Sequence, residues 1–187
     1  MNNLQIISSE ILNRITTKRV GETKFFEHAR FLSNLSDLSS QLSDSEVKFV
    51  VFGIREDIGV LANHGQPGTK DTWDIALKSL LNLQSNQFTN PSNVLILGHL
   101  DFTELYDALA TVASDPLLDI YRTYVEKIDQ CVSQLVCTIV KAGKTPILVG
   151  GGHNNAYGAI KGSALALDSK INAINFDAHT DLRALEG

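Results

Sequence analysis

The chain has 187 residues, of which 16 are basic and 21 acidic, so its formal net charge at neutral pH is −5. Hydrophobic residues make up 43% of the sequence, and it contains 13 glycines and 4 prolines, which is the balance of a globular domain rather than of a low-complexity segment. The basic residues are scattered, which argues against a nucleic-acid partner, because phosphate backbones attract clustered lysine and arginine. No stretch approaches the roughly 18 apolar residues that a membrane span needs, so we expect no membrane partner.

The start of the chain and its cysteines both favour a cytoplasmic protein. No basic region followed by a long apolar core marks a signal peptide at the N-terminus. Cys131 and Cys137 fall in a predicted helix, where their spacing separates them by about 9 Å along the axis. Because a disulfide needs Cα atoms within about 7 Å, we expect two free thiols in a reducing compartment.

The first part of the chain has helical patterns. Residues 8–19 and 22–34 predict two short helices, the first with a serine suitable as its N-cap. Residues 35–45 are rich in serine and aspartate and predict a loop. We therefore expect residues 1–46 to form an N-terminal helical segment.

Four short apolar runs then alternate with helical patterns. The runs are nearly continuous and most are bounded by glycine, which is typical of strands buried on both faces; they cover residues 47–53, 93–98, 146–150 and 171–177. Helical periodicity covers residues 71–84, 117–141 and 153–167, and Gly143 follows the longest of these helices as a stop signal. The alternation predicts βαβ units. We expect residues 47–187 to form a three-layer αβα domain around a mostly parallel sheet.

Polar side chains follow the third and fourth predicted strands. His153 comes after three glycines, and Asp177, His179 and Asp181 alternate after the fourth strand. Open α/β sheets place ligands outside the carboxyl ends of their strands, and alternate residues of an extended backbone point to the same side. If the two strands are neighbours, the four side chains converge. Imidazole and carboxylate ligands suit Mn²⁺, Fe²⁺ or Zn²⁺, and two such ions close together can share a hydroxide.

Two other interpretations of these residues stay open. In the first, Asp177 and Asp181 cap a helix or turn, and His179 is a buried imidazole with satisfied hydrogen bonds. In the second, Gly150–Gly152 form the turn of a nucleotide-binding module between a strand and a helix. Against the second, Asn155 occupies the third glycine position of that motif.

The segments that carry these motifs resemble the ureohydrolase family of arginases, agmatinases and formimidoylglutamases. The resemblance runs from Val47 to Gly187, and its most specific element is Asp-Ala-His-Thr-Asp at residues 177–181. Gly-Gly-His at 151–153 and the segments 53–60 and 63–68 also match. The end of the chain, residues 181–187, looks most like the formimidoylglutamase branch.

The resemblance implies an αβα sandwich and a dinuclear Mn²⁺ centre. By position, His153 and Asp181 would bind one ion and His179 the other. Asp177 would bridge both ions and hold the metal-bound hydroxide. The substrate would be a small linear amidine, for this branch N-formimidoyl-L-glutamate, hydrolysed to L-glutamate and formamide in histidine breakdown.

Other expectations concern the substrate and the extent of the site. Asn154, Arg183 and His64 are candidates for substrate contact, although Arg183 is equally well a solvated loop residue. The family carries two later metal-binding aspartates that these 187 residues do not contain, so we expect an incomplete ligand set, weak or mononuclear metal binding and no useful turnover.

A sheet that lacks its later strands exposes an unpaired edge, which favours a homo-oligomer. The alternative functions are an arginase- or agmatinase-type hydrolase and a non-catalytic, ureohydrolase-like binding protein.

Overall fold

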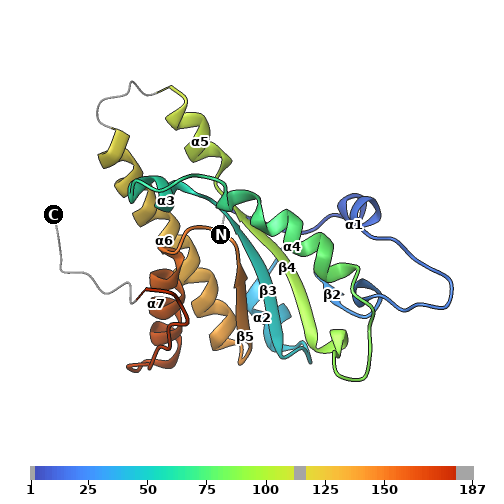
Figure 1. The fold of residues 1–187 in the computed structure, drawn as a ribbon. Coiled ribbons are helices and arrows are strands. Elements are labelled where there is room, and N and C mark those ends of the chain that lie inside the picture. The colour runs from blue at the N-terminus through green and yellow to red at the C-terminus, as the bar shows by residue number, and fades with distance from the viewer. Residues whose placement is uncertain (1–2, 112–116, 180–187) are drawn as a thin grey trace.

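A five-stranded sheet forms the centre of the chain (Figure 1). The structure is a computed structural model that describes residues 3–111 and 117–179. The strands are β1 (Leu4–Gln5), β2 (Arg30–Phe31), β3 (Phe49–Arg55), β4 (Val94–Asp101) and β5 (Thr145–Val149). The order is β1-β4-β3-β5, with β2 also paired to β4, and β1 is antiparallel while the other pairings are parallel. The expected mostly parallel sheet is confirmed.

Helices cover both faces of this sheet, as a three-layer αβα fold requires (Figure 1). One face packs against α2 (Leu38–Ser43) and α6 (Leu117–Lys141), and the other against α1 (Ser9–Ile15) and α4 (Thr72–Leu81). Both α3 (Ile58–Ala62) and α7 (Asn155–Leu167) pack on α6, while α5 (Thr103–Leu109) follows β4. Successive residues of β3 alternate between the two apolar clusters, which is why the strand reads as a continuous apolar run.

The longest helix has the bounds that its apolar stripe predicts. It buries Ile128, Val132 and Leu135 against the sheet. Gly143 adopts a left-handed conformation just beyond its end, with φ at 73°, and its N–H donates to Val140. Cys131 and Cys137 in this helix are both free, as expected. No helix in the described part of the chain is long and apolar enough to cross a membrane.

The first 46 residues contain less helix than their pattern predicts. The expected helix over 22–34 is wrong, because this segment forms a short 3-10 turn at Phe25–Glu27 and then β2. Phe25 is buried against the face that α4 covers, and β2 pairs with β4, so tertiary contacts override a weak helical pattern. The expected loop over 35–45 contains α2 instead, whose N-cap Asp37 accepts a hydrogen bond from the Ser40 N–H at 3.2 Å.

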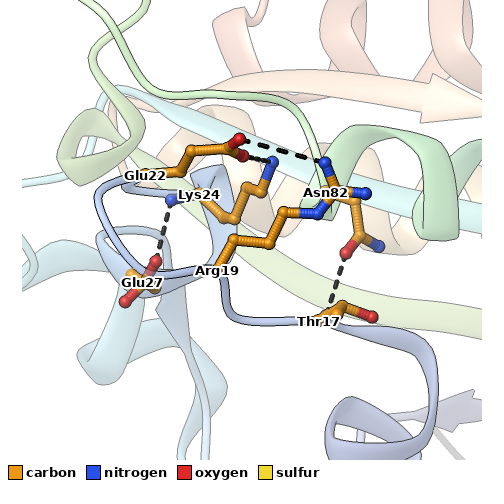
Figure 2. A network of polar contacts seen from close by, with 6 residues as sticks. All are labelled: Thr17, Arg19, Glu22, Lys24, Glu27 and Asn82. Carbon is orange, nitrogen blue, oxygen red and sulfur yellow. Dashed lines mark hydrogen bonds and ion pairs between the residues drawn. The ribbon is translucent and has the colours of Figure 1, made fainter.

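A polar network joins this N-terminal segment to the end of α4 (Figure 2). Asn82 accepts a hydrogen bond from the Thr17 N–H at 3.0 Å and donates to the Ile15 carbonyl at 2.8 Å. Figure 2 shows Glu22 between the side chains of Arg19 and Lys24. Arg19 lies 3.9 Å from the Glu22 carboxylate, and Lys24, which is buried, forms the closer ion pair. These contacts fix the chain between α1 and β2 against the end of α4.

The fourth expected strand, residues 171–177, is not a strand in the structure. Its large apolar side chains beyond Ile171 are solvent-exposed, with Ile174 at 83% and Phe176 at 96% exposure. A strand needs a hydrogen-bonding neighbour and apolar cover for its faces. The outer edge of β5 has no strand partner among the described residues, so the expected pairing of residues 171–177 beside β5 does not occur.

Candidate functional site

The sharp turn between β5 and α7 presents His153 at the carboxyl edge of the sheet. Gly150 and Gly151 have φ values of 84° and 75°, a left-handed conformation that side chains other than glycine rarely adopt. His153 follows with its residue exposed, and α7 begins two residues later, at Asn155. The turn lets the chain reverse from a strand into a helix while it leaves an imidazole at the surface of the edge.

An open cavity of about 590 Å³ lies beside this turn. Its wall includes Gly150–Gly152, His153 and, from a segment more than twenty residues later, Asp177. Ile54 and Leu148, from β3 and β5, form part of the apolar wall. The cavity therefore brings together two of the predicted metal ligands at the predicted edge of the sheet.

The carboxylate of Asp177 lies close to the imidazole of His179. Its Oδ1 accepts the backbone N–H of His179 at 3.2 Å and lies 3.7 Å from Nδ1 of the same residue. That backbone hydrogen bond, together with the charges of His153 and His179, holds the pKa of Asp177 below its usual value. Asp177 is therefore ionised at neutral pH, which is the state that a metal ligand needs.

The remaining predicted ligands are placed only in part. His179 is exposed, so the interpretation of it as a buried imidazole is wrong, whereas Asp177 does cap a local turn. Within the described residues, no three His, Cys, Asp or Glu side chains gather closely enough to hold a metal ion. Asp181 and Arg183 lie outside the described residues. The four-ligand set stays a prediction.

The two other candidates for substrate contact do not line this cavity. Asn154 points instead toward α3, where a Cβ added to Gly59 would lie 1.9 Å from its Oδ1. Both amide atoms of Asn154 are buried, and its side chain lies beside the carboxylate of Asp129, whose pKa it lowers. His64 is exposed just after α3, in a left-handed conformation with φ at 57°. Substrate contact by either residue stays a prediction.

Sequence reasoning assigned no role to two buried acids at the end of β3. Glu56 and Asp57 are 0% and 2% exposed. Glu56 accepts hydrogen bonds from the turn that carries His153, whereas Asp57 accepts the Tyr106 hydroxyl at 2.6 Å and the Gly68 N–H at 2.8 Å. Their position in the sequence could have indicated a role, because acids that directly follow a buried strand lie at the edge of the sheet where ligands bind.

A third acid, Asp129 on α6, lies in the same buried region. Removal from solvent, followed by the nearby charge of Glu56, raises the pKa of Asp129 to about 6. Its Oδ1 is buried and accepts no hydrogen bond from any described residue. The ionised form of Asp129 is therefore poorly stabilised in the folded protein.

The raised pKa of Asp129 predicts a pH-dependent stability. Between its ordinary pKa of 3.8 and the raised value of about 6, the folded state binds more protons than the unfolded state, so the free energy of unfolding falls as pH rises through this window. Asp129→Asn cannot ionise. It is expected to be more stable than the wild type by roughly 1 kcal/mol above about pH 6, since partial solvent screening reduces the full linkage energy, and to match it near pH 4.

Urea denaturation at about pH 4 and pH 7.5 measures this difference. Asp119→Asn is the control, because Asp119 lies on the same helix with its side chain 79% exposed. That variant is expected to show no gain that depends on pH. An Asp129→Asn variant that is no more stable than the wild type at the higher pH would contradict the buried, destabilising charge.

Comparison with known proteins identifies the domain to which this site belongs. The model of the arginase family matches residues 47–187, which is most of the chain and includes every predicted ligand. The chain belongs to the arginase family.

Curated relatives of this arginase-family chain are named formimidoylglutamases. One from Corynebacterium efficiens is 33% identical over 160 residues, which is 86% of this chain and 44% of the relative. One from Geobacillus kaustophilus is 32% identical over 165 residues, covering 87% and 45%, and one from Salmonella paratyphi C is 33% identical over 138 residues, covering 73% and 37%. The chain spans less than half the length of these relatives.

The described residues of this arginase-family chain fit a divalent metal in their chemistry. Imidazole nitrogen and ionised carboxylate oxygen are ligands that Mn²⁺ accepts. His153 and Asp177 line one cavity, and the His179 ring lies against the same carboxylate. His153 and Asp177 form a partial site, which further ligands would have to complete.

Proposed function

We propose that the protein is a metal-dependent hydrolase of linear amidines that converts N-formimidoyl-L-glutamate to L-glutamate and formamide. The observation that carries the proposal is the cavity that His153 and Asp177 share at the carboxyl edge of the sheet. Membership of the arginase family supports the reaction class, and relatives named formimidoylglutamase support the substrate. A cavity of about 590 Å³ is within the range of small-molecule sites.

The residues at this edge would have separate tasks. His153, Asp177, His179 and Asp181 would hold Mn²⁺, which when bound supplies Lewis-acid polarisation and a nucleophile at neutral pH. The N–H of His179 orients Asp177 and keeps it ionised. Ile54 and Leu148 would give the substrate an apolar surface on one side of the cavity. Cleavage of the carbon–nitrogen bond would release the amine after a proton is delivered to it.

The test is a side-by-side assay of the protein that the complete gene encodes, loaded with Mn²⁺. Formimidoylglutamate, arginine and agmatine are offered separately, and release of formamide or urea is measured. We expect cleavage of formimidoylglutamate, with loss of activity after chelation of the metal. Cleavage of only arginine or agmatine would overturn the substrate and favour an arginase- or agmatinase-type enzyme. Metal binding without hydrolysis of any of the three would favour a non-catalytic binding protein.

A further inference from the structure

We propose that Glu56 is the positioning residue that holds the His153 turn in its metal-binding arrangement. The inference rests on the proposed function, because it assigns the buried carboxylate a task for that same site. Glu56 directly follows the last residue of β3, and its side chain has no exposure to solvent. It lies beneath the turn between β5 and α7 and does not line the cavity itself.

Three N–H groups bind this carboxylate, two of them from the His153 turn. Oε1 accepts the backbone N–H of Gly152 at 2.5 Å and the side-chain amide of Asn155 at 2.6 Å. Oε2 accepts the N–H of Gly59 at 3.0 Å. No cation is paired with Glu56 in the described residues, so these donors stabilise its charge. Donors to both oxygens fix the orientation of the carboxylate as well as its place.

These hydrogen bonds restrain His153 from both sides. Gly152 precedes it and Asn155 follows two residues later, and both donate to the same oxygen of Glu56. The Asn155 amide also donates to the Gly152 carbonyl at 2.8 Å, which closes the turn on itself. The turn therefore has little freedom to move the imidazole relative to β3.

The glycines of the turn fit closely around the carboxylate. A Cβ added to Gly151 or to Gly152 would lie 3.1 Å from Oε1 of Glu56. At Gly151 the same Cβ would lie 2.5 Å from the Asn155 amide nitrogen. The close approach of backbone to carboxylate explains why glycine occupies both positions.

The neighbouring acid provides a matched control. Asp57 is as deeply buried as Glu56 and is also held by hydrogen bonds, but its partners are Tyr106 and Gly68. Loss of its charge disturbs the same end of β3 without a direct contact to the His153 turn. A purely structural role of buried acids predicts similar results for both residues, whereas the positioning role predicts a difference.

The experiment compares Glu56→Gln with Asp57→Asn in the protein that the complete gene encodes. In Glu56→Gln the charge is lost and one acceptor oxygen becomes an NH2 donor, so either the turn or Gly59 loses its acceptor and the remaining hydrogen bonds are weaker. We expect its dissociation constant for Mn²⁺ to rise about 10-fold, the lower end of the effect of losing a direct partner of a metal ligand, because Glu56 holds the turn and not the imidazole itself. The Gly152 amide is expected to exchange hydrogen more than about tenfold faster. Asp57→Asn is expected to leave both values within about twofold, whatever it does to stability.

The outcomes distinguish failure of the positioning role from failure of the proposed function. A folded Glu56→Gln protein with unchanged Mn²⁺ affinity overturns the positioning role and leaves the proposed function intact. A wild-type protein that binds no Mn²⁺ overturns the metal-dependent function and the metal-positioning role together, and unchanged exchange at Gly152 then shows that Glu56 does not hold the turn either. If Glu56→Gln does not fold, Asn155→Ala tests the same role, because it removes one of the two turn donors to Oε1 of Glu56. That variant is expected to weaken Mn²⁺ binding about 3- to 10-fold, and unchanged affinity would again overturn the inference.

Discussion

Replacing Trp73 by alanine is expected to lower the free energy of unfolding by about 3–5 kcal/mol. Trp73 lies on α4 and is 1% exposed. Its ring covers Gly53 in β3, where an added Cβ would lie 2.2 Å from the Trp73 Cδ2 atom. The indole fills the space that the glycine leaves on this face of the sheet, and its loss opens a cavity that a central strand cannot close. Urea denaturation followed by far-UV circular dichroism measures the effect, because the chain has no other tryptophan for fluorescence.

Ile75→Ala on the same helix is the control for this substitution. Ile75 is 69% exposed, so its truncation is expected to change stability by no more than about 0.5 kcal/mol. Equal effects of the two substitutions would contradict the packing of α4 on the sheet. Loss of several kcal/mol only in Trp73→Ala would support the fit between Trp73 and Gly53.

The sequence predicts well those elements whose own apolar pattern shows which of their residues are buried. The helix over 117–141 has the predicted bounds, because its apolar stripe and Gly143 mark the whole helix. The strands near 47–53, 93–98 and 146–150 are also present, shifted by at most a few residues. Each of these runs is apolar enough to be buried on both faces, and each is paired with a neighbouring strand in the sheet.

The elements that the sequence does not predict depend on distant partners. β1 and β2 have two residues each, and both are strands because they form backbone hydrogen bonds with β4. The converse case is 171–177, whose apolar residues predict a strand but find no described neighbour to pair with. Strand pairing is a non-local interaction, so a local pattern neither ensures it nor excludes it.

The same division applies to the candidate site. The glycine turn predicts where His153 lies, since glycines after a buried strand mark the ligand edge. The link between Glu56 and Gly152 spans 96 positions of the chain, and no local pattern reveals it. The position of Glu56 after a strand was visible, but its partners required the fold.

Replacing Gly162 by alanine is expected to destabilise the chain by about 2–3 kcal/mol, although alanine is the better helix former. Gly162 lies on α7 where this helix meets α6, and an added Cβ would lie 2.5 Å from the Ser133 carbonyl oxygen and 2.8 Å from Cβ of Val136. One turn earlier, Gly158 faces Val132 in the same way. A backbone carbonyl cannot turn aside as a flexible side chain can, so the two helices must move apart.

Ser163→Ala separates this steric effect from helix propensity. Ser163 is the next residue of α7, and its hydroxyl donates within the helix to the Ala159 carbonyl at 2.9 Å. Its replacement is expected to change the free energy of unfolding by less than about 0.5 kcal/mol, measured by urea denaturation as for Gly162→Ala. A Gly162→Ala variant as stable as the wild type would contradict the close contact of α6 with α7. Because the His153 turn leads into α7, this contact also determines where the start of that helix lies relative to the sheet edge.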